Sequence, residues 1–382
     1  MVKLTLLGAT GSIGSSTLAV VREQDPRFAI RLATAHSDHQ KLLRIAREFE
    51  VPVLVFTGIP DPAVQDRLRR QEPSRRIFFG EEELLQTLAS EDYDTALNAI
   101  SGSAGLRSSF AIAARGKKLA LANKESLVLA GHLLMPLIQS GTAELVPVDS
   151  EHSALFQAIG NHPAAEIRKL HITASGGAFR ELPLAEFPKI TVEQALRHPN
   201  WEMGAKVTLD SATMFNKALE VMEAHWLFGL PYDRITALIH PQSVIHSLVE
   251  FIDGSFLAQL STPDMKLPIL YALSHPERFA SQLVSTDLLQ LGALSFQAIA
   301  PERYPLYFLG LEAARRGGIF PTVINSANEA ALRLFLERRI AFTQIPSLCD
   351  QALQKQQAIA DPDLETIVEV NRRVYEQTLA KG

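Results

Sequence analysis

The stretch from His198 to Glu220 has an unusual density of side chains that can do chemistry. It reads HPNWEMGAKVTLDSATMFNKALE and combines an imidazole, an indole, ammonium groups, an amide, hydroxyls and carboxylates. A helix that serves only packing does not need that mixture. The combination indicates a site that holds an anionic, hydroxyl-rich molecule beside a metal ion.

The second half of this stretch predicts a helix that is capped by Asp210 or Ser211. At about 100° per residue, Asn216, Lys217 and Glu220 fall on one patch of its surface. A helix start at Ser211 would also point its dipole at a bound anion. The alternative interpretation is an ordinary surface ion pair between Lys217 and Glu220.

A second acidic group lies at the end of a predicted strand, in the segment Val148–His152. If the backbone stays extended there, Asp149 and Glu151 project to the same side, because side chains alternate along a strand. Two carboxylates that close repel each other unless a cation lies between them, and such oxygen ligands suit Mg²⁺ or Mn²⁺. The alternative is a solvated acidic turn. The spacing does not tell whether Glu220 lies near this pair.

Three glycines, Gly8, Gly11 and Gly14, follow the first predicted strand and lead into a helix. Glycine at such a turn lets the backbone approach a pyrophosphate, which the amide groups and the helix dipole then favour. A tight structural turn is the alternative, although three regularly spaced glycines exceed what a turn requires. The loop therefore predicts a dinucleotide site.

The tip of the second predicted strand bears on which dinucleotide binds. NAD sites usually have an acid there, about 20 residues beyond the glycine loop, that holds the ribose hydroxyls. This chain has Ala35, His36 and Ser37 instead, and Asp38 comes slightly late. An imidazole and a hydroxyl can receive a 2′-phosphate, so we expect NADP(H). The alternative is a plain exposed loop.

Two further segments suit a phosphate cradle and a lid. Ser175 and the two glycines after it end a predicted strand and can bind an oxyanion, although Ser-Gly-Gly is also ordinary loop chemistry. The loop from His198 to Gly204 contains Trp201 and Met203, and a loop with apolar side chains can close over a ligand and exclude water. The alternative is that Trp201 packs on the surface of its own domain.

The elements that must position these residues indicate an α/β fold in three parts. Strand and helix patterns alternate through residues 1–150, which predicts a Rossmann-like parallel sheet that binds the nucleotide. Residues 151–290 mix strands with polar loops and predict a central α+β catalytic and dimerisation domain. Strand signals then fade, so we expect a linker at 291–305 and a C-terminal helical bundle at 306–382.

Composition excludes several classes of protein. The 382 residues are 47% hydrophobic and 21% charged, which is typical of a soluble globular protein. A net charge of -5 without a basic tract argues against nucleic acid as a partner. Cys349 is the only cysteine, so neither an internal disulfide nor a cysteine zinc site can form. Without a signal peptide or an apolar run of about 18 residues, we expect a cytoplasmic protein with no membrane contact.

Together these motifs resemble the 1-deoxy-D-xylulose 5-phosphate reductoisomerase family. The resemblance covers nearly the whole chain. The segments that carry it are GATGSIG at 8–14, ANKES at 122–126, PVDSEH at 147–152, TASGGAFR at 173–180, the stretch at 198–220, HPQSVIHS at 240–247 and NSANE at 325–329.

The resemblance implies a homodimeric, NADPH-dependent oxidoreductase of the non-mevalonate route to isoprenoid precursors. It implies conversion of 1-deoxy-D-xylulose 5-phosphate to 2-C-methyl-D-erythritol 4-phosphate, by retro-aldol and aldol steps followed by hydride transfer. It also implies a divalent cation, Mg²⁺ or Mn²⁺, with Co²⁺ as a further candidate.

Carried over by position, the resemblance implies a role for each site residue. The metal ligands would be Asp149, Glu151 and Glu220, which with Lys124 form the catalytic group. The substrate would contact Lys124, Ser150, Glu151, Ser175, His198, Ser211, Asn216, Lys217 and Glu220. NADPH would contact Thr10, Gly11, Ser12, Ile13, Asn123, Glu125 and Gly204, with its 2′-phosphate near Ala35, His36 and Ser37. Trp201 and Met203 would belong to the lid.

Two other functions fit part of the pattern. One is a metal-independent NAD(P) dehydrogenase of another phosphorylated small molecule, in which the acids only orient the substrate. The other is a non-enzymatic, nucleotide-sensing Rossmann protein, although the reactive side chains at 198–220 argue against it. A requirement for a divalent ion separates the first from the reductoisomerase, and substrate-dependent oxidation of NADPH separates the second.

Overall fold

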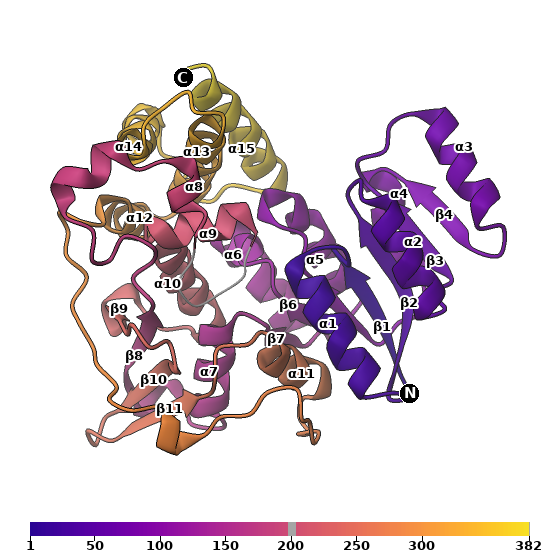
Figure 1. Ribbon diagram of the computed structural model, residues 1–382, viewed down its shortest axis with the longest axis horizontal. Coiled ribbons are helices and arrows are strands. Elements are labelled where there is room, and N and C mark those ends of the chain that lie inside the picture. Colours follow the sequence, from indigo (N-terminus) through magenta and orange to yellow (C-terminus); the bar gives the residue numbers. More distant parts are fainter. Residues whose placement is uncertain (198–203, 382) are drawn as a thin grey trace. The chain divides into compact units, whose positions relative to one another are not determined.

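The computed structural model describes residues 1–197 and 204–381 (Figure 1). The chain forms two compact units, each assembled from three segments. The first unit consists of Met1–Ser126, Leu134–Ser153 and Asp264–Ser285, and the second of Leu127–Leu133, Ala154–Pro263 and Thr286–Gly382. The division into a catalytic domain, a linker at 291–305 and a helical domain stays a prediction.

Seven strands of the first unit form one parallel sheet, in the order β4-β3-β2-β1-β5-β6-β7. The last four residues of β1 are buried, because a parallel sheet is covered on both faces and selects continuous apolar runs. The strand order reverses at β1 and β5, and the carboxyl ends of strands at such a point are where α/β proteins bind ligands. The predicted Rossmann-like sheet is confirmed. Its strands are β1 Val2–Leu7, β2 Phe28–Ala35, β3 Val53–Phe56, β4 Arg76–Phe79, β5 Thr95–Asn98, β6 Lys118–Leu121 and β7 Leu145–Pro147.

Helices alternate with these strands along the chain. A later segment returns to the first unit, where α11 packs against α1, β6 and β7, and the Lys118 ammonium donates to the carbonyl of His275 at 2.6 Å. The helices are α1 Ser12–Glu23, α2 His39–Glu48, α3 Pro62–Gln71, α4 Glu81–Ser90, α5 Leu106–Ala114 and α11 Lys266–Ser274, while α6 Glu125–Ser140 and α7 Ser150–Ile159 contribute residues to both units.

The second unit contains a mixed sheet in the order β11-β10-β8-β9. One face of this sheet packs on helix α10, Phe215–Phe228, in a core that includes Leu170, Val249 and Val221. This packing fixes the position of α10 on the sheet, and with it the polar residues in the first turns of the helix. The strands are β8 Ile167–Ala174, β9 Ile235–Ile239, β10 Ile245–Phe251 and β11 Phe256–Leu260.

The C-terminal helices that the sequence predicts are confirmed, and α13 packs with α12, α14 and α15 (top of Figure 1). The sequence favours Asp361 as the cap of the last helix, with Pro362 in its first turn. That assignment is wrong, because Asp363 is the N-cap and accepts from the amide of Thr366 at 2.8 Å. In the described part of the chain, no helix has the length and apolarity needed to cross a membrane. The remaining α-helices of the second unit are α8 Val192–Ala195, α9 Ala205–Ala212, α12 Pro305–Arg316, α13 Phe320–Leu336, α14 Ile345–Lys355 and α15 Leu364–Leu379.

Candidate active site

The glycine loop between β1 and α1 uses its three glycines differently. Gly8 has φ +78°, and a Cβ there would lie 2.6 Å from the carbonyl oxygen of Ala99. A Cβ on Gly14 would lie 2.5 Å from backbone atoms of Ala9. A Cβ on Gly11 would meet nothing closer than 3.5 Å. Packing therefore requires Gly8 and Gly14, whereas Gly11 leaves room for a ligand to approach the N-terminus of α1.

The remaining loop residues of the predicted cofactor site lie at the start of α1 and directly before it. Ser12 and Ile13 begin α1, and the carbonyl of Thr10 accepts from the Lys41 ammonium at 2.8 Å. Lys41 also donates to the Ser15 hydroxyl at 3.0 Å. Sequence reasoning missed Lys41, which brings a cation to a loop expected to bind phosphates.

The tip of β2, where the sequence predicts a 2′-phosphate contact, is an exposed loop in the structure. Ala35 ends the strand, and the exposed His36 lies 3.2 Å from the Thr57 hydroxyl. Its ring occupies space that a side chain on Gly58 would fill. Asp38, which comes late for a ribose-binding acid, is the N-cap of α2 and accepts from the Lys41 amide at 3.0 Å. The acid therefore serves the helix, and Ser37 is the exposed hydroxyl beside it.

Asn123, at the end of β6, is buried and holds several loops together. Its amide nitrogen donates to the carbonyls of Ile100 and Gly102 at 2.6 and 2.8 Å and to the Glu125 carboxylate at 3.2 Å. Its amide oxygen accepts from the hydroxyl of Ser126 at 2.5 Å. The Asn123 side chain thus orders the start of α6, where the buried Glu125 and Lys124 lie.

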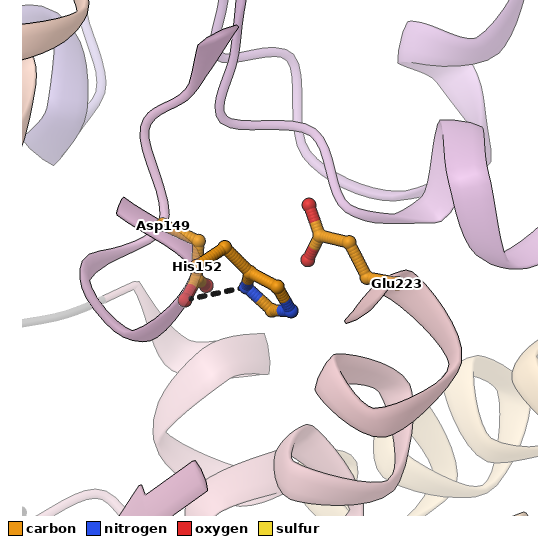
Figure 2. A group of neighbouring side chains, drawn as sticks. All are labelled: Asp149, His152 and Glu223. Atoms are coloured by element: carbon orange, nitrogen blue, oxygen red, sulfur yellow. Dashed lines mark hydrogen bonds and ion pairs between the residues drawn. The ribbon is translucent and has the colours of Figure 1, made fainter. Parts of the chain in front are cut away.

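Asp149 follows β7 and is surrounded by cationic and polar partners. The Lys124 ammonium lies 2.7 Å from one of its oxygens. Nδ1 of His152 lies 3.1 Å from the other oxygen (Figure 2). Burial would raise the pKa of Asp149, yet the charges and hydrogen bonds of Lys124 and His152 hold that pKa well below its usual range. Asp149 is therefore a carboxylate at neutral pH and suits a hard cation.

The predicted extended backbone at Asp149 and Glu151 is wrong. Helix α7 begins at Ser150, so Glu151 lies in its first turn and does not alternate with Asp149 along a strand. The Glu151 amide donates to Asp149 Oδ1 at 3.2 Å, and the Ser150 hydroxyl donates to the Glu151 carboxylate at 2.5 Å. Helix capping by Asp149, rather than strand alternation, brings this pair together.

The predicted phosphate cradle follows β8. Gly176 and Gly177 both have positive φ, 85° and 69°, which shapes the turn after Ser175. The Ser175 hydroxyl accepts from the amide of Gly177 at 3.1 Å, and a side chain on Gly177 would collide with the carbonyl oxygen of Ser211. Tyr304 donates to the carbonyl of Gly176 at 2.8 Å. The cradle therefore rests directly on the backbone of Ser211.

The helix predicted to start at Asp210 or Ser211 is in fact two helices. Met214, with φ +59°, separates α9 from α10, and Ser211 lies in the last turn of α9. The N-terminal dipole predicted for Ser211 is therefore wrong, and the start of α10 at Phe215 supplies that dipole instead. A left-handed conformation is uncommon for a residue other than glycine, and here it breaks the predicted helix.

Asn216, Lys217 and Glu220 form the patch that the sequence predicts on α10. The Asn216 amide and the Lys217 ammonium both donate to the Glu220 carboxylate. Lys217 is 4% exposed and Glu220 is 1% exposed, so this is a buried ion pair and not the ordinary surface pair of the alternative interpretation.

Two groups of side chains among the described residues could hold a metal ion. One contains Asp149, Glu151 and Glu220, and the other contains Asp149, His152 and Glu223 (Figure 2). In each group the candidate ligand atoms lie within 4.8 Å of one another. Three carboxylates suit Mg²⁺ or Mn²⁺, so the first group has the donor chemistry that the sequence predicts.

Sequence reasoning missed two members of the second group, His152 and Glu223, both fully buried. Glu223 follows Glu220 by three residues, a spacing that places two side chains on the same face of a helix. This spacing could have identified Glu223 from the sequence as a second carboxylate near Glu220. His198, Trp201 and Met203, predicted for the substrate and the lid, lie outside the described residues, and Gly204 is the exposed N-cap of α9.

Family models cover most of the chain. Residues 4–131 match 1-deoxy-D-xylulose 5-phosphate reductoisomerase, residues 145–228 match a C-terminal domain of that family, and residues 260–377 match a second DXP reductoisomerase C-terminal domain.

Full-length relatives give the same result. The 1-deoxy-D-xylulose 5-phosphate reductoisomerase of Synechococcus sp. (strain JA-2-3B'a(2-13)) is 46% identical over 380 residues, which cover 99% of this chain and 97% of the relative. The protein of that name from Listeria monocytogenes serotype 4b is 44% identical over 385 residues, covering 99% of this chain and all of the relative.

Solved structures extend the similarity to the fold. A crystal structure of DOX-P reductoisomerase in complex with NADPH, fosmidomycin and magnesium superposes with a TM-score of 0.94 at 40% identity, covering 100% of this chain and 98% of that one. The Zymomonas mobilis protein in complex with NADPH gives a TM-score of 0.91 at 37% identity, covering 99% and 98%.

Proposed function

Because this chain belongs to the 1-deoxy-D-xylulose 5-phosphate reductoisomerase family, we propose that it converts this substrate to 2-C-methyl-D-erythritol 4-phosphate with NADPH and a divalent cation. The protein is then an oxidoreductase of isoprenoid precursor biosynthesis. The observation that carries the proposal is the group of three carboxylates, Asp149, Glu151 and Glu220.

These carboxylates would bind Mg²⁺ or Mn²⁺, and magnesium is the metal in three solved structures of relatives. Lys124 prepares the site, because its ammonium keeps Asp149 ionised. A bound divalent ion would act as a Lewis acid on the keto group and the adjacent hydroxyl of the substrate. We propose that Lys124 and Ser150 also contact the sugar backbone.

Ser175, Ser211, Asn216 and Lys217 would bind the phosphate of the substrate. Three features of the second unit support this assignment. The cradle at Ser175 rests on Ser211, α10 begins with its positive dipole end at Asn216 and Lys217, and the Lys217 ammonium is held by a buried carboxylate. Anchoring the phosphate supplies binding energy far from the reacting carbons, which aligns them. His198 would close over the same group.

The rearrangement would break one carbon–carbon bond by a retro-aldol step and form another by an aldol step, giving a branched aldehyde phosphate. NADPH would then transfer its hydride to that aldehyde. The chain's own residues hold both fragments in place, offset the charge of the enolate and exclude water.

NADPH would be held mainly by residues of the first unit. Its phosphates would meet Thr10, Gly11, Ser12 and Ile13, with Lys41 as an additional cation beside them. Its 2′-phosphate would lie near Ala35, His36 and Ser37, and Asn123, Glu125 and Gly204 would complete the cofactor site. The side chain of Asn123 would act by ordering the loops, because its amide is engaged with backbone carbonyls.

The substitution Gly11→Ala separates cofactor binding from folding. We expect the KM for NADPH to rise by about tenfold or more, because a methyl group would stand where a pyrophosphate approaches the backbone. The midpoint of thermal unfolding should change little, since the new Cβ meets nothing within 3.4 Å. Gly14→Ala is the control, and it should lower the unfolding midpoint. An unchanged KM for NADPH would exclude Gly11 from the cofactor site.

The proposed reaction is tested by following NADPH absorbance with purified protein and 1-deoxy-D-xylulose 5-phosphate. Oxidation of NADPH is expected only with substrate and a divalent ion, and EDTA should abolish it until Mg²⁺ or Mn²⁺ is restored. Turnover that resists EDTA would favour a metal-independent dehydrogenase. Absence of turnover under every metal and nucleotide condition would favour a nucleotide-sensing protein.

We also propose that the protein is a homodimer that pairs through the second unit. Strand β11 is an edge strand, and its side chains Phe256, Leu257 and Leu260 are 52, 47 and 39% exposed. An apolar edge strand of this kind invites a partner strand or face. The mass in solution, compared with 42.0 kDa for one chain, tests the proposal.

A further inference from the structure

The NSANE segment at 325–329 belongs to α13, and the proposed substrate, metal and NADPH sites include none of its residues. Asn325, Ser326 and Asn328 are fully buried. Buried polar side chains are retained where they make hydrogen bonds, since an unsatisfied one costs free energy of folding. The bonds of this segment therefore indicate what it holds in place.

Asn328 reaches from α13 to α9. Its amide nitrogen donates to Oδ1 of Asp210 at 2.7 Å, and Asp210 is 1% exposed. The other oxygen of Asp210 accepts from the Lys206 ammonium at 3.0 Å. Asp210 is thus a buried carboxylate held by a lysine of its own helix and by an amide of another helix.

The position of Asp210 matters because Ser211 follows it. The carbonyl of Ser211 is the surface on which Gly177 rests, so a shift in the last turn of α9 must also displace the loop at Ser175. A carboxylate beside a phosphate site repels the phosphate unless neighbouring donors offset its charge. Lys206 and Asn328 both donate to Asp210, so they hold the last turn of α9 in place and offset the charge of this carboxylate.

We propose that Asn328 is a positioning residue for the substrate phosphate. Through Asp210 it fixes the last turn of α9, and thereby Ser211 and the cradle at Ser175, without touching the substrate. The C-terminal helices then contribute to substrate affinity as well as to stability. This inference rests on the proposed function, in which Ser175 and Ser211 bind the phosphate.

The test is Asn328→Ala, compared with Ser326→Ala. Ser326 is equally buried on the same helix but donates to the Asn371 side chain at 2.5 Å and to the Thr322 carbonyl at 2.6 Å, not to α9. Asn328→Ala is expected to raise the KM for 1-deoxy-D-xylulose 5-phosphate about tenfold, because the hydrogen bond to the charged Asp210 is lost. The KM for NADPH should stay unchanged. Ser326→Ala is expected to lower the unfolding midpoint without changing either KM.

A second measurement does not depend on turnover. The Kd of inorganic phosphate, measured by calorimetry on metal-free protein, should rise about tenfold in Asn328→Ala and stay unchanged in Ser326→Ala. If Asn328→Ala does not fold, Asn328→Asp keeps the shape of the side chain and places a carboxylate against Asp210. At alkaline pH that variant should weaken phosphate binding further than tenfold.

The outcomes separate this inference from the proposed function. If the wild-type protein does not turn over the substrate, the proposed function fails, while the phosphate Kd values still decide the inference. If Asn328→Ala keeps the wild-type phosphate Kd, the inference is overturned. It is also overturned if both alanine variants change kcat, the KM for NADPH and the phosphate Kd to the same extent, since that result describes a general loss of stability.

Discussion

The substitution Glu220→Gln is expected to lower kcat by about 100-fold or more while NADPH binding stays nearly unchanged. Glutamine keeps the shape of the side chain but not its charge, so the metal loses an anionic ligand. Removing a residue that only supports a metal ligand already costs about 10- to 100-fold in metal affinity or activity, and loss of the ligand itself should reach at least the upper end. The buried Lys217 also loses its counter-ion.

Three measurements check this prediction. Steady-state kcat is compared at saturating Mg²⁺ and Mn²⁺, the Kd of Mn²⁺ is measured by calorimetry, and the Kd of NADPH is measured by fluorescence. Glu193→Gln is a matched control, because Glu193 is exposed and forms a surface ion pair with the exposed Arg338. Wild-type turnover of Glu220→Gln at saturating metal would remove Glu220 from the set of ligands.

The second large effect is expected for Lys124→Met, through the ionisation of Asp149. The pKa of Asp149 is depressed in the folded protein, so the stability it contributes is present above its unfolded pKa and is lost as the pH falls through the folded pKa. Without Lys124, burial remains and raises the pKa of Asp149. A proton then competes with the metal at a higher pH, and the acid limb of the pH profile of kcat/KM moves upward.

The magnitude follows from the burial of the Lys124–Asp149 pair, whose side chains are 11 and 13% exposed. Breaking a buried pair on one side costs about 3–5 kcal/mol, so the metal-free variant should unfold more readily than the wild type. Activity at neutral pH should fall about 10- to 100-fold. The control is Lys3→Met, since Lys3 pairs with Asp92 at an exposed position where little should change. An unshifted acid limb in Lys124→Met would contradict the role assigned to Lys124.

Local signals in the sequence were sufficient for the parallel-sheet class and the glycine loop of the first unit. Buried parallel strands leave continuous apolar runs such as that of β1, and the turn at Gly8 and Gly14 demands glycine for backbone reasons alone. Helix periodicity likewise placed Asn216, Lys217 and Glu220 on one patch, because residues three and four apart are neighbours on any α-helix. Each of these predictions depends on only a few consecutive residues.

Other features could not be predicted because they depend on residues far apart in the chain. Nothing near Met214 in the sequence announces the left-handed turn that ends α9 and places Ser211 at a helix end. The hydrogen bond from Asn328 to Asp210 spans 118 residues. A buried polar side chain bonds to whichever groups the fold places beside it once water is excluded. A short sequence pattern contains no information about those distant neighbours.

The sequence by itself therefore determined the residue types of the site: glycines for a nucleotide, carboxylates for a metal, and hydroxyl, amide and ammonium groups for a phosphate. Tertiary structure decided how they are used. Helix α7 begins at Ser150, so that Asp149 caps it and is held by Lys124 and His152. The helix predicted from Asp210 or Ser211 is broken at Met214 into α9 and α10. Chemistry is a property of side chains, whereas geometry and pKa depend on what is packed around them.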